Sequence, residues 1–104
     1  MENRLDGQGI VSADESDAQR ARRHLQVEVG AKIKSLREDA GIGQAECASH
    51  AGIDKSSMFR AEKGELNITL ETLARLALGI GVSMDRFVSG VTIDPAIVER
   101  RVRK

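Results

Sequence analysis

Residues 44–64 read QAECASHAGIDKSSMFRAEKG, and this stretch decides the fold. It contains two short segments with helical spacing, 44–51 and 55–63, separated by Gly52, Ile53 and Asp54. Glycine commonly ends a helix and aspartate commonly caps the next one, so the second segment is expected to begin after Asp54 and to end at Gly64. The stretch therefore predicts two short helices joined by a three-residue turn.

Regular apolar repeats lie on both sides of this pair. The repeat before it has steps of three and four and ends at Gly41: Leu25, Val29, Ile33, Leu36 and Ala40. The repeat after it follows Thr69, a good N-cap: Leu70, Leu73, Leu76, Ala77 and Ile80. Both spacings are typical of amphipathic helices whose apolar stripe faces a common core. The pair is thus predicted to lie between two longer helices.

The C-terminal part predicts two further short helices. A fifth turn begins at Ser83, and Met84, Phe87 and Val88 can fold back on the preceding stripe. Asp94 and Pro95 begin a last short helix that runs to about Val102. The apolar run 91–93 is too short for a sheet. We therefore expect an all-α fold: a compact five-helix domain, a short C-terminal helix and a polar N-terminal extension.

The chain divides into three segments by composition. Residues 1–22 form the polar, acidic extension, residues 23–88 the helical domain and residues 89–104 the C-terminal extension. Ser12 and Glu15 have the spacing of a capping box, so a helix could begin there; equally, the pattern could arise by chance in a polar tail.

Composition excludes several classes of protein. The 104 residues suffice for one domain. Because 16 basic residues balance 16 acidic ones, the chain is not a uniformly basic nucleic-acid binder. With no Trp or Tyr it lacks the aromatic platforms of single-strand binders. The single Cys47 cannot form an internal disulfide, and no apolar run reaches the ~18 residues of a membrane span. We expect a cytoplasmic, nucleoid-associated protein with no membrane contact.

The neutral total conceals an uneven distribution of charge. Residues 1–19 contain one basic and five acidic residues, whereas residues 20–63 contain nine basic and six acidic ones. Residues 89–104 add four basic and two acidic residues. The helical domain therefore carries a modest positive charge. We call the acidic residues 1–19 the acidic leader, and we hypothesise that this leader shields the basic surface of the domain.

From Val29 to Val88 the chain resembles the phage-repressor-like, or Xre-type, helix-turn-helix family of DNA-binding regulators. The matching positions occur in the family's order: Leu36-Arg37, Gly41, Gln44, Ala48, Gly52, Glu62, Gly64, Leu70, Leu73, Ala77, Gly81, Val82 and Ser83. The resemblance implies that the helix after Asp54 is the recognition helix, which enters the major groove, and that the helix opened by Gln44 braces it. Met58 and Ala61 are then expected to face the core.

The outward positions of the recognition helix would contact double-stranded DNA: Lys55, Ser56, Phe59, Arg60 and Lys63. Arg60 is the candidate for reading guanine through O6 and N7, or else it is a solvated or phosphate-bound arginine. Ser56 either faces the groove or forms a hydrogen bond with backbone groups at the start of its own helix. Gln44 would hold a phosphate, or serve only as a cap, and Lys63 would contact phosphate.

Two further readings concern packing. Phe59 either touches thymine methyl groups or folds back into space left by the small residues Cys47, Ala51 and Ala61. Arg37 and Glu62 are identified through the family as a structural ion pair between the first helix and the recognition helix.

No chemistry beyond binding is indicated. Cys47 is assigned to the core, and His24 and His50 lie too far apart in sequence for a zinc site. The sequence implies no metal and no cofactor, and it contains no arrangement of nucleophile and base, so we expect no enzyme.

The function favoured is a sequence-specific transcriptional regulator, a repressor that binds a pseudo-palindromic operator as a homodimer. Apolar residues after the motif form the dimer interface or complete the monomer's core: Met84, Phe87, Val88, Val91, Ile93, Ile97, Val98 and Val102. One alternative is an antitoxin that binds DNA and, through residues 1–22 or 89–104, a toxin partner. Another is a helix-turn-helix fold used as a protein-binding adaptor.

Overall fold

The computed structural model describes residues 15–98 of the chain. They form α1 (Asp17–Asp39), α2 (Gln44–Ala51), α3 (Lys55–Lys63) and α4 (Leu70–Ile80), then the short 3-10 helices η2 (Met84–Phe87) and η3 (Pro95–Ile97). The all-α class is confirmed for this part of the chain, which contains no β-strand. None of its helices combines the length and the apolar character needed to cross a bilayer.

The predicted count of five helices in the domain is wrong, because the described residues contain four α-helices. The fifth predicted segment is η2, a single 3-10 turn, after which Val88 leaves helical geometry at φ −119°. Such short segments commonly adopt the tighter 3-10 form. The C-terminal helix is likewise reduced to η3 in the described part, and its predicted end at Val102 lies outside the described residues.

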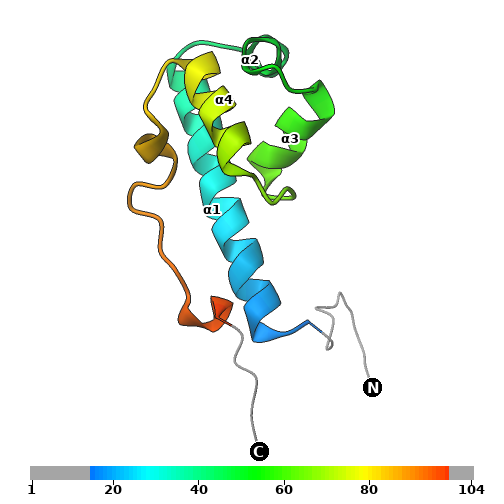
Figure 1. Ribbon diagram of the computed structural model, residues 1–104, viewed down its shortest axis with the longest axis vertical. Helices are drawn as coiled ribbons and strands as arrows, with labels where there is room; N and C mark the ends of the chain where they lie inside the picture. Colours follow the sequence, from blue (N-terminus) through cyan, green and yellow to red (C-terminus); the bar gives the residue numbers. More distant parts are fainter. Residues whose placement is uncertain (1–14, 99–104) are drawn as a thin grey trace, which may run out of the picture.

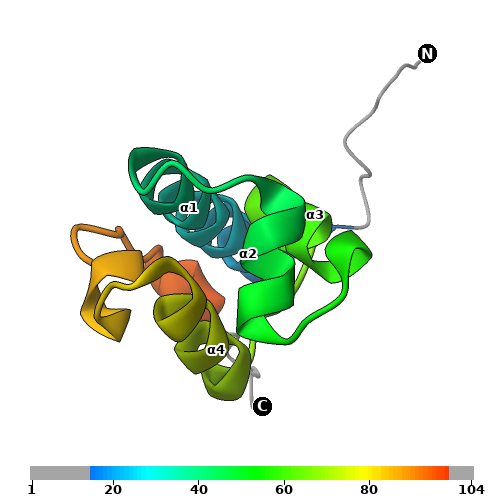
Figure 2. The same ribbon diagram turned by 90° about the horizontal axis from the view of Figure 1, so that it is seen from above.

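The helices are arranged around α1, which runs along the long axis of the molecule (Figure 1). The view from above shows α2 between α3 and α4, and it packs against both (Figure 2). The segment after η2 returns along α1, so that η3 contacts this helix. The pair α2 and α3 is therefore held on one side of a helical scaffold made by α1 and α4.

Each element of the domain contributes one large side chain to the centre of the core. Ile33 of α1, Cys47 of α2, Met58 of α3, Leu76 of α4 and Phe87 of η2 are all fully buried. Burying an aliphatic or aromatic side chain of this size contributes about 1.5–3 kcal/mol. The inward position predicted for Met58 is confirmed, and η2 completes the core despite its short length.

The predicted helix ends are confirmed around the turn. The Asp54 carboxylate accepts a hydrogen bond from the Ser57 backbone N–H at 2.7 Å, which caps α3. The Thr69 hydroxyl accepts one from the Thr72 N–H at 3.1 Å and caps α4. Gly52 follows α2 at φ 70°, a left-handed conformation that glycine adopts without a steric cost. The turn between α2 and α3 is therefore fixed by local chemistry.

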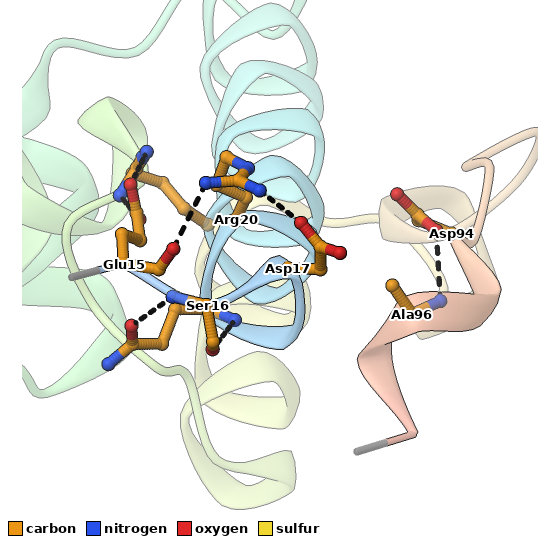
Figure 3. Close-up of polar contacts among 8 residues, drawn as sticks. Glu15, Ser16, Asp17, Arg20, Asp94 and Ala96 are labelled. Carbon is orange, nitrogen blue, oxygen red and sulfur yellow. Dashed lines mark hydrogen bonds and ion pairs between the residues drawn. The ribbon is translucent and has the colours of Figure 1, made fainter. Parts of the chain in front are cut away.

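The first helix starts earlier than the apolar repeat predicts, at Asp17. Ser16 and Gln19 form a capping box, in which the Gln19 N–H donates to Ser16 Oγ at 3.0 Å and the Ser16 N–H donates to Gln19 Oε1 at 2.8 Å (Figure 3). Arg20 also donates to the Glu15 carbonyl at 3.1 Å. The alternative cap at Ser12 lies outside the described residues. Part of segment 1–22 is thus helical and continuous with α1.

Backbone approaches backbone where α1 crosses α3. A Cβ atom on Gly30 would lie 2.4 Å from the Ala61 carbonyl oxygen and 2.8 Å from that of Glu62. Real Cβ contacts are not this short, so the two helices can meet here only because residue 30 is glycine. This contact fixes the distance between the scaffold helix and α3.

The segment between η2 and η3 is tied to α1 by polar contacts. Glu28 Oε1 accepts hydrogen bonds from the Thr92 N–H at 2.9 Å and from the Thr92 hydroxyl at 3.2 Å. His24 Nε2 lies 3.4 Å from the same hydroxyl. Asp94 then caps η3 by accepting a bond from the Ala96 N–H at 2.9 Å (Figure 3). We call residues 88–98 the C-terminal strap.

One core assignment on α4 is wrong. Leu70 is 76% exposed, although it was counted as the first member of the buried stripe. It is the first residue of α4 and lies at the edge of the face formed by Leu76, Ala77 and Ile80, so it does not reach the core. Leu78, on the opposite side of the helix, is 83% exposed.

Candidate functional site

The outward face of α3 gathers five exposed side chains: Lys55, Ser56, Phe59, Arg60 and Lys63. The opposite face is buried, with Met58 and Ala61 fully enclosed. The orientation of α3 inferred from the sequence therefore agrees with the structure. We call these five residues the α3 face.

The α3 face carries three cations and no carboxylate. The single acidic residue of α3, Glu62, is 8% exposed and points into the protein. Asp54 precedes the helix, and hydrogen bonds from Ser57 lower the pKa of its carboxyl group and engage it as a cap. The surface that α3 presents to solvent is thus positively charged, in a chain whose total charge is zero.

Glu62 is held by two other helices. Its carboxylate accepts bonds from Arg37 Nε at 2.6 Å and Arg37 Nη2 at 3.0 Å, so the ion pair implied by the family resemblance is present. Arg37 Nη1 also donates to the Ile42 carbonyl at 2.8 Å. The Glu62 carboxylate raises the pKa of Arg37, and both side chains are almost fully buried. The network joins α1, the loop after it and α3.

Gln44 belongs to the same network, which the sequence did not reveal. Its Nε2 donates to Glu62 Oε1 at 2.9 Å, so the amide is engaged inside the protein. The N-cap of α2 is Gly43, which has no side chain to bond the first-turn N–H groups. The start of α2 therefore offers backbone donors, while the Gln44 side chain ties α2 to α3.

Phe59 is a surface residue. Its side chain is 49% exposed, and Lys63 Nζ lies 5.1 Å from the centroid of its ring. The alternative in which Phe59 folds back into the space beside Cys47, Ala51 and Ala61 is wrong, because about half of Phe59 is exposed whereas these three small residues are buried.

The two other cations at the end of α3 lie near the following loop. Arg60 Nη2 is 3.5 Å from the Glu65 carbonyl, and Lys63 Nζ is 3.5 Å from Glu65 Oε2. Both contacts are long and solvent-exposed, so they hold the side chains weakly. Both cations remain available to a ligand.

The residues predicted for a dimer interface or for the monomer's core fall into four groups. Met84, Val88, Ile93 and Val98 are between 37% and 68% exposed. Val91 and Ile97 are partly buried, and Val102 lies outside the described residues. Of the two alternatives for Phe87, the structure shows the second, because this ring is fully buried in the monomer's own core. Val88 also lines a small apolar groove of about 190 Å³ with Leu25, Val29, Leu66, Ile68 and Leu73.

No side-chain cluster in the described part of the chain has the composition of a metal site. Cys47 is fully buried, and burial raises the pKa of its thiol, so it remains protonated and packs as a core residue.

The family model described as a helix-turn-helix domain matches residues 28–87. The chain belongs to this helix-turn-helix family. The resemblance inferred from the spacing of its motifs is therefore confirmed. The helix-turn-helix unit is formed by α2, the turn 52–54 and α3, and the first turns of α1 precede the matched region.

Individual proteins of this kind are similar to the chain. It is 25% identical over 68 residues to the control protein C.MunI of Mycoplasma sp, which covers 64% of this chain and 92% of that protein. It is 45% identical over 47 residues to a Pyrococcus horikoshii protein named as an HTH-type transcriptional regulatory protein, which covers 45% of this chain. The chain spans only 15% of the length of that relative.

A solved structure is also similar to part of the chain. The restriction-modification controller protein C.AhdI from Aeromonas hydrophila superimposes with a TM-score of 0.59 at 26% identity. The match covers 60% of this chain and 94% of that one. Nearly the whole of that chain is therefore similar in fold to somewhat more than half of this one.

Proposed function

We propose that this helix-turn-helix protein is a sequence-specific transcriptional regulator that binds double-stranded DNA through the α3 face. The observation that carries the proposal is the charge of that face, where three cations are exposed and the single carboxylate of α3 is turned inward. A major groove about 12 Å wide accommodates one helix, and its walls are lined by phosphates. The names of the similar proteins, which include a transcriptional regulatory protein and controller proteins, support the same function.

Within this proposal the residues of the α3 face have different tasks. Arg60 reads a base, because a guanidinium can donate to guanine O6 and N7 together. Lys55 and Ser56 lie in the first turn, near the end of the helix that enters the groove. Lys63 contacts phosphate. The phosphate contacts supply affinity that depends on the salt concentration, and the base contacts supply sequence specificity.

The start of α2 supplies a second contact to the DNA backbone. Because Gly43 leaves the first-turn N–H groups without a side-chain partner, a phosphate oxygen can accept from them in the favourable field of a helix N-terminus. Gln44 contributes its backbone N–H to this contact. Its side chain instead fixes α2 against Glu62, so the position of the phosphate contact relative to α3 is set before DNA binds.

The active form is proposed to be a homodimer that acts as a repressor on a pseudo-palindromic operator. One short recognition helix reads only a few base pairs, and two half-sites supply the missing specificity. The exposed apolar residues of the C-terminal strap, Val88, Ile93 and Val98, together with Met84 of η2, are the surface proposed to join two copies.

Selection from a random pool of duplex DNA tests the proposal, followed by titration of the enriched duplex against salt. We expect a site with two-fold symmetry and an affinity that falls steeply as salt rises. Equal affinity for all duplexes, without enrichment, would remove the claim of sequence-specific recognition.

A further inference from the structure

We infer that Phe59 recognises the C5-methyl group of a pyrimidine in the major groove and that Lys63 holds its ring in position. This inference rests on the proposed DNA-binding function and adds a chemical specificity to it. The group recognised is a methyl carbon on the pyrimidine ring, supplied by thymine or by 5-methylcytosine.

The position of Phe59 on α3 is the first argument. Lys55, Phe59 and Lys63 occur at steps of four residues, so they lie on one stripe of the helix with the ring at its centre. A helix lying in the groove turns its outward side chains to the base edges and the phosphates. Phe59 belongs to this outward surface and lies midway along it, with Lys55 one turn before it and Lys63 one turn after it.

The second argument is chemical. Hydrogen-bond donors and acceptors dominate the edges of base pairs in the major groove, and the methyl group of thymine is the apolar feature among them. A phenyl ring can neither donate to nor accept from the polar groups in the way that Arg60 can. The favourable contact for a half-exposed ring at this position is therefore burial against a methyl group.

The third argument is the contact between the ring and Lys63. Lys63 Nζ lies over the ring, 5.1 Å from its centroid, and it also lies 3.5 Å from Glu65 Oε2. A cation over the face of an aromatic ring attracts it electrostatically. About half of Phe59 is exposed and can contact the DNA. Lys63 is thus a positioning residue as well as a phosphate ligand.

The test uses the full chain and the duplex enriched in the selection. Each thymine is replaced in turn by deoxyuridine, which lacks the methyl group, and each cytosine by 5-methylcytosine, which adds one. If thymine is the source, one deoxyuridine in each half-site weakens binding about fourfold, the loss expected when a methyl-sized apolar contact is removed. If 5-methylcytosine is the source, one such replacement tightens binding by a similar factor.

Variants assign the effect to the ring. In Phe59→Ala the sensitive replacement no longer changes affinity, whereas Phe59→Leu retains part of the effect because its side chain is still apolar. Lys63→Ala reduces the methyl dependence and Lys63→Arg restores it, since a guanidinium can also lie over the ring. Loss of phosphate binding alone would leave the methyl dependence unchanged in Lys63→Ala.

The outcomes separate this inference from the proposed function. Failure to enrich any duplex contradicts the proposed function itself. Enrichment of a site at which no methyl group matters to the wild-type protein overturns the inference and leaves the function intact, as does an undiminished methyl effect in Phe59→Ala. Because Phe59 is on the surface, we expect the variants to retain the wild-type melting temperature.

Discussion

Arg37 near the end of α1 and Glu62 near the end of α3 form a buried ion pair with two hydrogen bonds, at 2.6 and 3.0 Å. Removing one partner leaves the other charge buried without compensation, which costs about 3–5 kcal/mol. Arg37→Met should therefore lower the free energy of unfolding by about this amount in a urea titration. Arg75→Met is the control, since the Arg75–Glu71 pair is exposed and should contribute less than about 1 kcal/mol.

The double variant Arg37→Met/Glu62→Leu refines this prediction. It removes both buried charges and should recover part of the stability lost in Arg37→Met. Equal losses in Arg37→Met and Arg75→Met would contradict the structural role of the buried pair.

Replacement of Gly30 by alanine tests the close contact between α1 and α3, because two effects change the stability in opposite directions. Alanine is intrinsically more favourable than glycine in a helix by about 1 kcal/mol, so propensity alone would make Gly30→Ala more stable. The new Cβ would lie 2.4 Å from the Ala61 carbonyl oxygen, and we expect a net loss of about 1–3 kcal/mol instead. Ser35→Ala, at an exposed position of the same helix, should be neutral or slightly stabilising. Thermal unfolding measures both, and a raised melting temperature for Gly30→Ala would refute the close contact.

Arg60→Ala should relax base preference at one position of each half-site, with a loss of about 1–3 kcal/mol in discrimination there. The measurement is binding to the enriched duplex and to its single-base-pair variants. Arg75→Ala is matched in charge but lies on α4, and it should leave the preference unchanged. A uniform loss of affinity for all duplexes in Arg60→Ala would assign this side chain to phosphate.

Two substitutions that introduce a charge test where the dimer interface lies on the surface. Ile93 of the C-terminal strap and Leu78 of α4 are 68% and 83% exposed, so neither Ile93→Glu nor Leu78→Glu should unfold the monomer. Ile93→Glu should shift sedimentation toward monomer, because a carboxylate would be buried at the proposed interface. Leu78→Glu should leave self-association unchanged. The reverse pattern would move the interface to α4.

The acidic leader can be tested without disturbing the fold. Removal of residues 1–14 eliminates three acidic residues and one basic residue but leaves the Ser16 cap of α1. We expect tighter binding to non-specific duplexes at low salt, with the difference vanishing at high salt as charges are screened. An unchanged affinity at low salt would show that the leader does not shield the α3 face.

Local signals predicted the helix ends well, because their physics involves neighbouring residues. The caps at Asp54 and Thr69 and the glycine after each short helix follow from hydrogen bonds and backbone conformation within four residues. The same logic could have found the start of α1, since Ser16 and Gln19 have capping-box spacing. Ser12 and Glu15 have the same spacing, so spacing alone does not distinguish the two possible starts.

Assignments that depend on tertiary packing were less secure. The sequence left Phe87 between a dimer interface and the monomer's core, and it fills the core because η2 lies against both α1 and α4. Leu70 continued a regular repeat and is nevertheless exposed at the edge of the buried face. The bond from Gln44 to Glu62 spans 18 residues, and no spacing in the sequence indicates it.

The contact of η3 with α1 brings the two ends of the described chain together. Ser16 and Val98 flank these two elements, at the end of α1 that lies away from α2 (Figure 1). In a variant trimmed to residues 15–98, a fluorescent protein or an affinity tag attached through a short linker at either end would therefore be tethered on the same side of the molecule. Because these two ends lie near each other, the domain is suited to circular permutation. In such a variant a few added residues join the two ends and the chain is opened at a surface loop.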